Sequence, residues 1–70
     1  MNTGLYKHLG FNTRDEYLTA LANYVEDELD SASVYVMADL LGPIEDLDGL
    51  LSMIADEVGY MITPEDFSEV

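Results

Sequence analysis

The chain has 70 residues, no cysteine and a formal net charge of −13 at pH 7, from fifteen acidic and two basic residues. The lack of cysteine excludes disulfides and thiolate metal sites, and a domain of this size has only a marginal core. Lys7 and Arg14 are the only basic residues, so no lysine or arginine occurs from Asp15 to Val70. Such a charge repels nucleic acid and anionic membranes and attracts basic surfaces and cations, which argues against direct nucleic-acid binding.

The composition favours one folded domain over residues 1–70. Hydrophobic residues make up 49% of the chain and include five tyrosines and two phenylalanines, whereas disordered acidic tails contain few such residues. No apolar run approaches the about 20 residues of a membrane span, and the first residues do not form a basic and then apolar secretory signal. The expected compartment is therefore the cytoplasm.

Hydrophobic periodicity predicts an all-α fold of four to five short helices joined by short connections. The first helix is expected over residues 3–9, and Gly10 ends it. His8, the only histidine, is expected on the surface of this helix.

A second helix is predicted to begin at Thr13, which has the capping-box spacing to Glu16. Its apolar positions form one stripe: Tyr17, Leu18, Leu21, Tyr24, Val25 and Leu29. We therefore expect this helix to continue to about residue 30. Its last turn would then contain Glu26, Asp27, Glu28 and Asp30. Because the negative end of the helix dipole lies there, this placement is either tolerated or functional.

A third helix is predicted from Ser31 or Ser33, as its cap, to about Leu41, where Gly42 ends it. It is apolar on nearly all sides, with Asp39 as its one charge, which is typical of a central helix or of an interface. The expected interface residues are Tyr35, Met37 and Leu40.

A fourth helix is predicted to begin at Asp46 and to end near residue 58. Its core-facing stripe consists of Leu47, Leu50, Leu51, Ile54 and Val58. Gly49 inside the helix costs about 1 kcal/mol relative to alanine, which indicates close packing or an earlier break. After an extended link, Thr63 is expected to start a last turn that returns Phe67 to the core.

The sequence around Gly49 resembles part of a calcium-binding EF-hand loop, with Asp46 and Asp48 at ligand positions. Ile44 and Ala55 would then occupy the first and last ligand positions, and neither side chain can bind a cation. No metal site is therefore expected. Asp46 and Asp48 are instead expected to cap the fourth helix and to stabilise its dipole.

No residue pattern indicates catalysis. A single histidine excludes a triad built on several titrating groups and a metal site built on several histidines. Ser31, Ser33 and Ser52 have no nucleophile motif around them, and general acid–base chemistry needs a carboxyl group in a cleft. We therefore expect no enzyme activity and no cofactor.

Two resemblances bear on function. Residues 46–67 resemble the end of an acyl carrier protein, a family that is also small, acidic and helical. That family attaches phosphopantetheine to the serine of an Asp-Ser-Leu motif, and this chain has Asp46, Leu47 and Asp48 there, without a serine. The carrier chemistry is therefore not expected.

The second resemblance is to small, acidic, uncharacterised proteins of phages and mobile elements. Those proteins contain stretches similar to Ala38–Leu50 (ADLLGPIEDLDGL) and to Arg14–Leu18 (RDEYL). The resemblance implies a phage or mobile-element origin and no particular activity.

The acidic surface predicts a protein-binding role. Carboxylates three or four residues apart on a helix lie about 5–6 Å from one another, and duplex DNA carries one charge per about 1.7 Å of axis. Acids on adjacent helices can therefore imitate phosphates, and phage-encoded inhibitors of restriction and CRISPR enzymes are similar in size and charge. We expect a non-enzymatic inhibitor or adaptor that binds a basic, nucleic-acid-binding host protein. The expected contact residues are Glu26, Asp27, Glu28, Asp30, Asp39, Glu45, Asp46 and Asp48.

Two other interpretations stay open. In the first, the apolar helix over residues 34–41 makes the protein a homodimer or a subunit of a larger assembly. In the second, the acidic face has no partner and serves solubility, or reflects a halophilic host.

Overall fold

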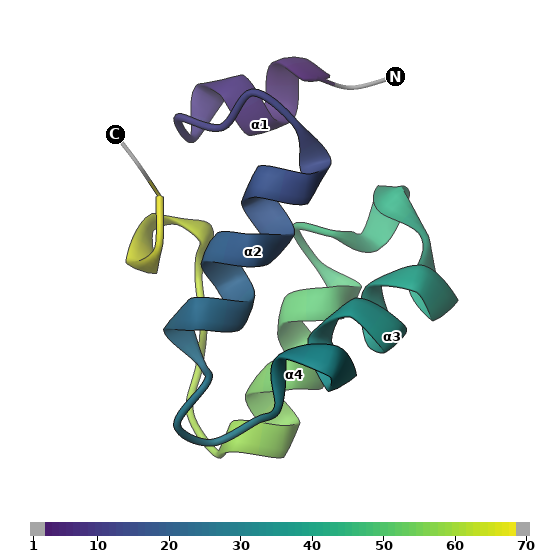
Figure 1. The fold of residues 1–70 in the computed structure, drawn as a ribbon, viewed down its shortest axis with the longest axis vertical. Helices are drawn as coiled ribbons and strands as arrows, with labels where there is room; N and C mark the ends of the chain where they lie inside the picture. Colours follow the sequence, from purple (N-terminus) through teal and green to yellow (C-terminus); the bar gives the residue numbers. More distant parts are fainter. Residues whose placement is uncertain (1–2, 69–70) are drawn as a thin grey trace.

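The computed structural model describes residues 3–68, and all regular secondary structure in this range is helical (Figure 1). In chain order they are α1 (Thr3–His8), α2 (Arg14–Tyr24), α3 (Ser31–Leu41), the 3-10 helix η1 (Pro43–Glu45), α4 (Gly49–Val58) and the 3-10 helix η2 (Pro64–Asp66). The predicted all-α fold of short helices is confirmed. None of the helices in this range is long and apolar enough to cross a membrane.

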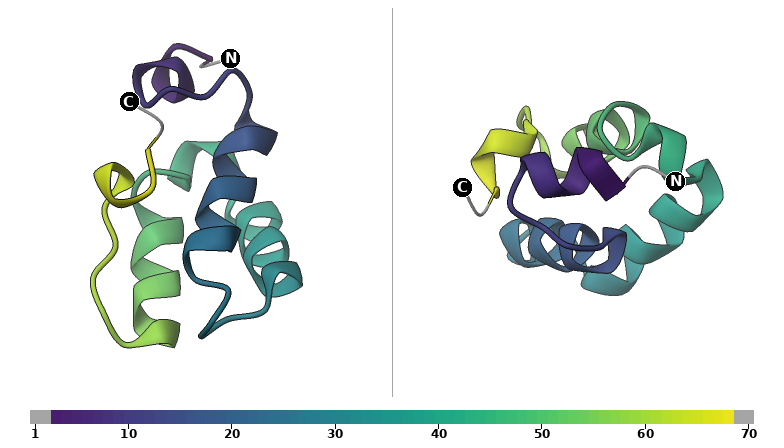
Figure 2. Two further views of the ribbon diagram at one scale, coloured as in Figure 1. Left: turned by 60° about the vertical axis from the view of Figure 1, so that its left-hand side comes forward. Right: turned by 90° about the horizontal axis from the view of Figure 1, so that it is seen from above.

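α2, α3 and α4 run in alternating directions and form the body of the molecule (Figure 1). α3 packs against both α2 and α4, and α1 packs against α2. Figure 2 shows α1 across one end of this body, while the segment after α4 returns along the outside of α4. The α2–α3 turn and the end of α4 lie together at the opposite end (Figure 1).

Aromatic side chains form the centre of the core. The ring centroid of Tyr17 lies 5.3 Å from those of Tyr6 and Phe67 and 5.9 Å from that of Phe11. Aliphatic residues complete the core. They are Leu18, Leu21 and Ala22 of α2, Val25 directly after it, Val34 and Ala38 of α3, Leu50, Leu51 and Ile54 of α4, Ile62 in the segment after α4, and Leu9 of the α1–α2 connection. The predicted return of Phe67 to the core is confirmed.

The predicted N-terminus of α2 is confirmed, with one difference. The Thr13 hydroxyl accepts a hydrogen bond from the Glu16 backbone N–H at 3.2 Å. The Glu16 carboxylate accepts from the Asn12 backbone N–H at 2.9 Å, one residue before the position that a capping box requires.

The predicted C-terminus of α2 is wrong, because the helix ends at Tyr24 rather than near residue 30. The chain turns at once, and the backbone N–H groups of Glu28 and Leu29 donate to the Val25 carbonyl at 2.9 and 2.8 Å. The acids of residues 26–30 therefore follow α2 in a turn instead of forming its last helical turn.

The predicted starts of α3 and α4 are also corrected. Asp30, rather than Ser31 or Ser33, is the N-cap residue of α3. α4 begins at Gly49 instead of Asp46, because η1 and a further turn take up the residues before it.

Gly49 stands where the chain approaches itself closely. Its N–H donates to the Glu45 carboxylate at 3.1 Å, and a β-carbon at this position would collide with the same carboxylate. Of the two alternatives predicted from this glycine, the structure has the break, because α4 begins at Gly49, and the only close neighbour is the side chain of Glu45.

Candidate functional site

Asp46 lies in the interior, so the structure corrects its predicted place on the acidic surface. Its side chain is 1% exposed. Its Oδ2 atom accepts hydrogen bonds from the Tyr6 hydroxyl at 2.6 Å and from Arg14 Nε at 2.7 Å, and its Oδ1 atom accepts from Arg14 Nη2 at 3.0 Å. This carboxylate is already bound within the fold and is not available to a partner. We had also expected Asp46 to cap α4, and this prediction is wrong, because the residue at the N-cap position is Asp48.

The polar cluster around Asp46 joins four parts of the chain. The Tyr17 hydroxyl donates to the Asp46 backbone carbonyl at 2.6 Å, and Arg14 Nη2 donates to the Ala38 carbonyl at 3.0 Å. Burial, together with the hydrogen bond to Asp46, raises the pKa of Tyr6 to about 12. Burial also raises the pKa of Tyr17, and the hydrogen bond from Arg14 to Asp46 raises the pKa of the guanidinium. The cluster therefore holds α1, α2, α3 and the segment before α4 together, with neutral phenols and a charged Arg14.

The pair between half-buried Arg14 and buried Asp46 neutralises one of the few positive charges of the chain. Arg14 is one of only two basic residues, and its charge is matched by Asp46. Lys7, in α1, is then the one remaining lysine or arginine in a chain that has fourteen other acidic residues. His8 is exposed on the same helix, as predicted.

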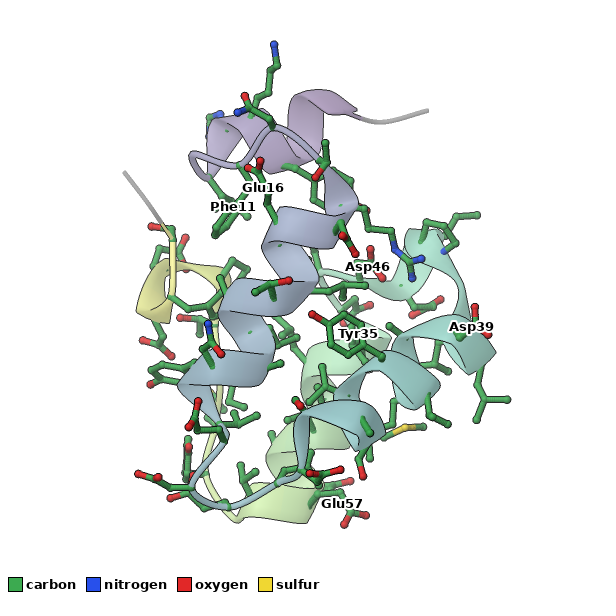
Figure 3. All side chains as sticks on the ribbon, in the orientation of Figure 1. Phe11, Glu16, Tyr35, Asp39, Asp46 and Glu57 are labelled. Atoms are coloured by element: carbon green, nitrogen blue, oxygen red, sulfur yellow. The ribbon has the colours of Figure 1, made fainter. Side chains whose placement is uncertain are left out.

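Acidic side chains gather at the end of the molecule opposite α1. Glu26, Asp27, Glu28 and Asp30 are all exposed on the turn between α2 and α3. Figure 3 shows Glu57, in the last turn of α4, at this same end. We call these five residues the acidic pole. The Tyr60 hydroxyl donates to Glu28 Oε1 at 3.1 Å and so ties the segment after α4 to the α2–α3 turn.

The backbone adds to the negative field of the acidic pole. α2 and α4 both end there, and the C-terminus of a helix carries about half a negative charge. α3 begins there and contributes the opposite sign, so the two helix ends outweigh the one helix start.

The acids of the pole are spread out rather than convergent. Between residues 3 and 68, no group of three or more acidic, histidine or cysteine side chains could hold a metal ion.

The remaining predicted contact residues lie away from the pole. Asp39 is exposed on α3 and stands well apart from Glu57 in Figure 3. Glu45 is half-buried and bound to the Gly49 N–H, and Asp48 is exposed directly before α4. The structure thus brings together four of the eight predicted residues. It adds Glu57, which sequence reasoning missed.

The predicted apolar interface is only partly exposed. The Tyr35 hydroxyl forms a hydrogen bond with the Thr19 hydroxyl at 2.8 Å, and Met37 packs partly against the core. Leu40 is 78% exposed. Two further exposed apolar residues were missed by the sequence reasoning: Val36, one turn before Leu40, and Ile44 in η1, which are 58% and 90% exposed. We call Val36, Leu40 and Ile44 the outer face of α3.

No protein-family model, curated protein or solved structure matches this chain. Geometry and charge therefore carry the functional argument. They define a small helical protein with a strongly acidic end, exposed apolar side chains on α3 and η1, and an ion pair between half-buried Arg14 and buried Asp46.

Proposed function

We propose that this protein is a non-enzymatic inhibitor or adaptor that binds a basic, nucleic-acid-binding protein through the acidic pole. The observation that carries the proposal is the gathering of Glu26, Asp27, Glu28, Asp30 and Glu57 at one end, while Arg14 is matched internally by Asp46. The pole meets the partner in the place of phosphates. The resemblance of residues 38–50 to stretches of small acidic phage proteins supports a phage or mobile-element origin. The size and charge of the chain, which are similar to those of anti-restriction and anti-CRISPR proteins, support action of that kind in the cytoplasm.

The electrostatics favour such a partner over other targets. Negative charge concentrated on one end steers a basic surface toward that end and raises the association rate. Because exposed charges are screened over about 8 Å at physiological ionic strength, binding through the pole must weaken as salt is added.

A pull-down tests the proposal. The tagged protein is incubated with host lysate at low salt, washed and eluted with a salt step, and the bound proteins are identified by mass spectrometry. We expect a nucleic-acid-binding protein that elutes with salt and that duplex DNA displaces. A partner that survives high salt and ignores competing DNA would contradict the proposal.

A second function, as an assembly subunit, is favoured by the outer face of α3. Three large apolar side chains, Val36, Leu40 and Ile44, are exposed on α3 and η1, and exposed apolar surface of sufficient area marks interaction sites. An assembly held by this face resists salt and is disrupted by Leu40→Asp. Sedimentation of the wild type and of this variant separates the two functions, because Leu40→Asp leaves the acidic pole intact.

A further inference from the structure

A groove runs along the side of α4 opposite α3, between that helix and the segment that returns after it. Its volume is about 660 Å³, and its walls are α4 and residues 59–64. Leu51 and Ile62, both buried, contribute to its floor, and Met61, 81% exposed, stands on its wall. Ser52, in α4, also lines the groove.

The charged side chains that line this groove are all acidic. Asp48 lines it directly before α4, and Asp56 lines it near the end of α4. The two residues are eight positions apart, which corresponds to about 12 Å along a helix. No basic side chain is among the described residues that line the groove.

One wall of the groove also offers backbone hydrogen-bonding groups. Residues 60–63 have no regular secondary structure, and the Thr63 N–H is bound by the Asp66 carboxylate at 2.9 Å. The backbone groups of Met61 and Ile62 take part in none of the hydrogen bonds formed between residues 3 and 68. An extended peptide can pair with such groups as an added strand does.

We propose that this groove binds a short extended peptide segment of a partner, with apolar side chains between two basic ones. In an extended chain, residues i and i+4 are about 13 Å apart and point to the same side, while i+1 and i+3 point to the other. Basic residues at i and i+4 therefore reach Asp48 and Asp56, and apolar residues at i+1 and i+3 face Leu51 and Ile62. The acidic pole lies outside the groove, so this site does not depend on the proposed function.

The test is an NMR titration of the ¹⁵N-labelled full chain with a blocked pentapeptide that has arginine at positions one and five and leucine at positions two and four. At about 20 mM salt, where screening is weak, we expect amide shifts concentrated on residues 47–64. The Asp48→Asn and Asp56→Asn changes should each weaken binding by about threefold, in line with exposed ion pairs.

Matched variants separate the groove from general acidity. Glu57→Gln removes the same charge from the residue next to Asp56 and should weaken binding clearly less than Asp56→Asn does, because Glu57 is not among the groove residues. Ser52→Phe fills the groove without changing its charge and should abolish binding. A peptide with serine in place of both leucines should bind at least tenfold more weakly.

Three results would overturn the proposal. The first is the absence of any shift with the leucine peptide. The second is equal binding of the leucine and serine peptides, which would mean that charge alone holds them. The third is an equal loss of affinity in Glu57→Gln and Asp56→Asn. None of these results bears on whether the acidic pole binds a basic protein.

Discussion

At the scale of single residues, Asp46 connects most of the fold. A buried carboxylate is strongly unfavourable unless it is paired and hydrogen-bonded, and Asp46 receives three hydrogen bonds from Tyr6 and Arg14. Replacing one partner leaves the other unsatisfied, which costs more than replacing both by groups of similar shape.

The first prediction concerns this ion pair. Arg14→Met should lower the free energy of unfolding by about 2–4 kcal/mol, because it leaves the Asp46 carboxylate buried without its counter-charge. The double variant Arg14→Met/Asp46→Leu should lose less than the sum of the two single changes. Urea denaturation of the four proteins measures the coupling. Strictly additive losses would show that the pair contributes nothing as a pair.

The second prediction concerns alkaline pH. The pKa of Tyr6 is raised from 10 in the unfolded chain to about 12, so folding favours its neutral form. The resulting stability is fully present below pH 10 and is lost as the pH rises from 10 to 12. Tyr6→Phe should therefore flatten the fall of the free energy of unfolding over that window. Parallel curves for the variant and the wild type, in denaturant melts at each pH, would contradict this role.

At the scale of elements, the most informative feature is the acidic charge placed near the ends of the helices. The α2–α3 turn holds four acids close to the C-terminus of α2. Like charges and the negative helix end both oppose this arrangement, so selection for stability alone does not explain it.

The third prediction follows from that strain. Glu26→Gln and Asp27→Asn should each raise the free energy of unfolding by about 0.3–1 kcal/mol at low ionic strength. The gain should shrink as salt is added, because both groups are exposed. Thermal melts at low and high salt check this expectation. A loss of stability in either variant would show that the acid makes a favourable contact in the folded state.

The fourth prediction concerns the end of α4. Gly59 has φ +89°, and its missing side chain would meet nothing within 4 Å, so only the backbone conformation requires glycine there. Gly59→Ala should cost about 1–2 kcal/mol, and Gly59→Asn should cost less because asparagine tolerates the left-handed region. Equal melting temperatures for all three proteins would contradict this.

The positions of the helices were predicted from the sequence more accurately than the residues at which the helices begin and end. The apolar stripes of α2 and α4 are local patterns, and they located both helices. The end of α2 depends on a turn in which Glu28 and Leu29 bond to Val25, and apolar Leu29 extends the stripe beyond it. Periodicity alone does not detect such a turn.

The candidate site was predictable where it is local. The four acids of the α2–α3 turn are consecutive or nearly so, so any fold brings them together. Asp46 is different, because its partners Tyr6 and Arg14 lie 40 and 32 residues away and nothing near Asp46 marks it as buried. The one available signal was Arg14, a rare base directly after a helix cap in an acidic chain. Glu57 joins the pole only through the packing of α4.

At the scale of the whole molecule, the surface is negative, and acidic side chains are concentrated at the end opposite α1. Lys7 and exposed His8 belong to α1 at one end, and the acidic pole lies at the other (Figures 1 and 3). A partner with a basic surface is therefore oriented before contact, which favours docking through the pole rather than through any acid on the surface.

The affinity for the captured partner, measured over a series of salt concentrations, tests this account most directly. The wild type is compared with a pole variant, Glu26→Gln/Asp27→Asn/Glu57→Gln, and with a control of equal charge, Asp15→Asn/Asp39→Asn/Glu65→Gln. We expect the pole variant to bind at least tenfold more weakly at low salt, with a shallower salt dependence, and the control to stay close to the wild type. Equal losses in the two variants, or an affinity that does not change with salt, would contradict the claim that the acidic pole is the binding surface.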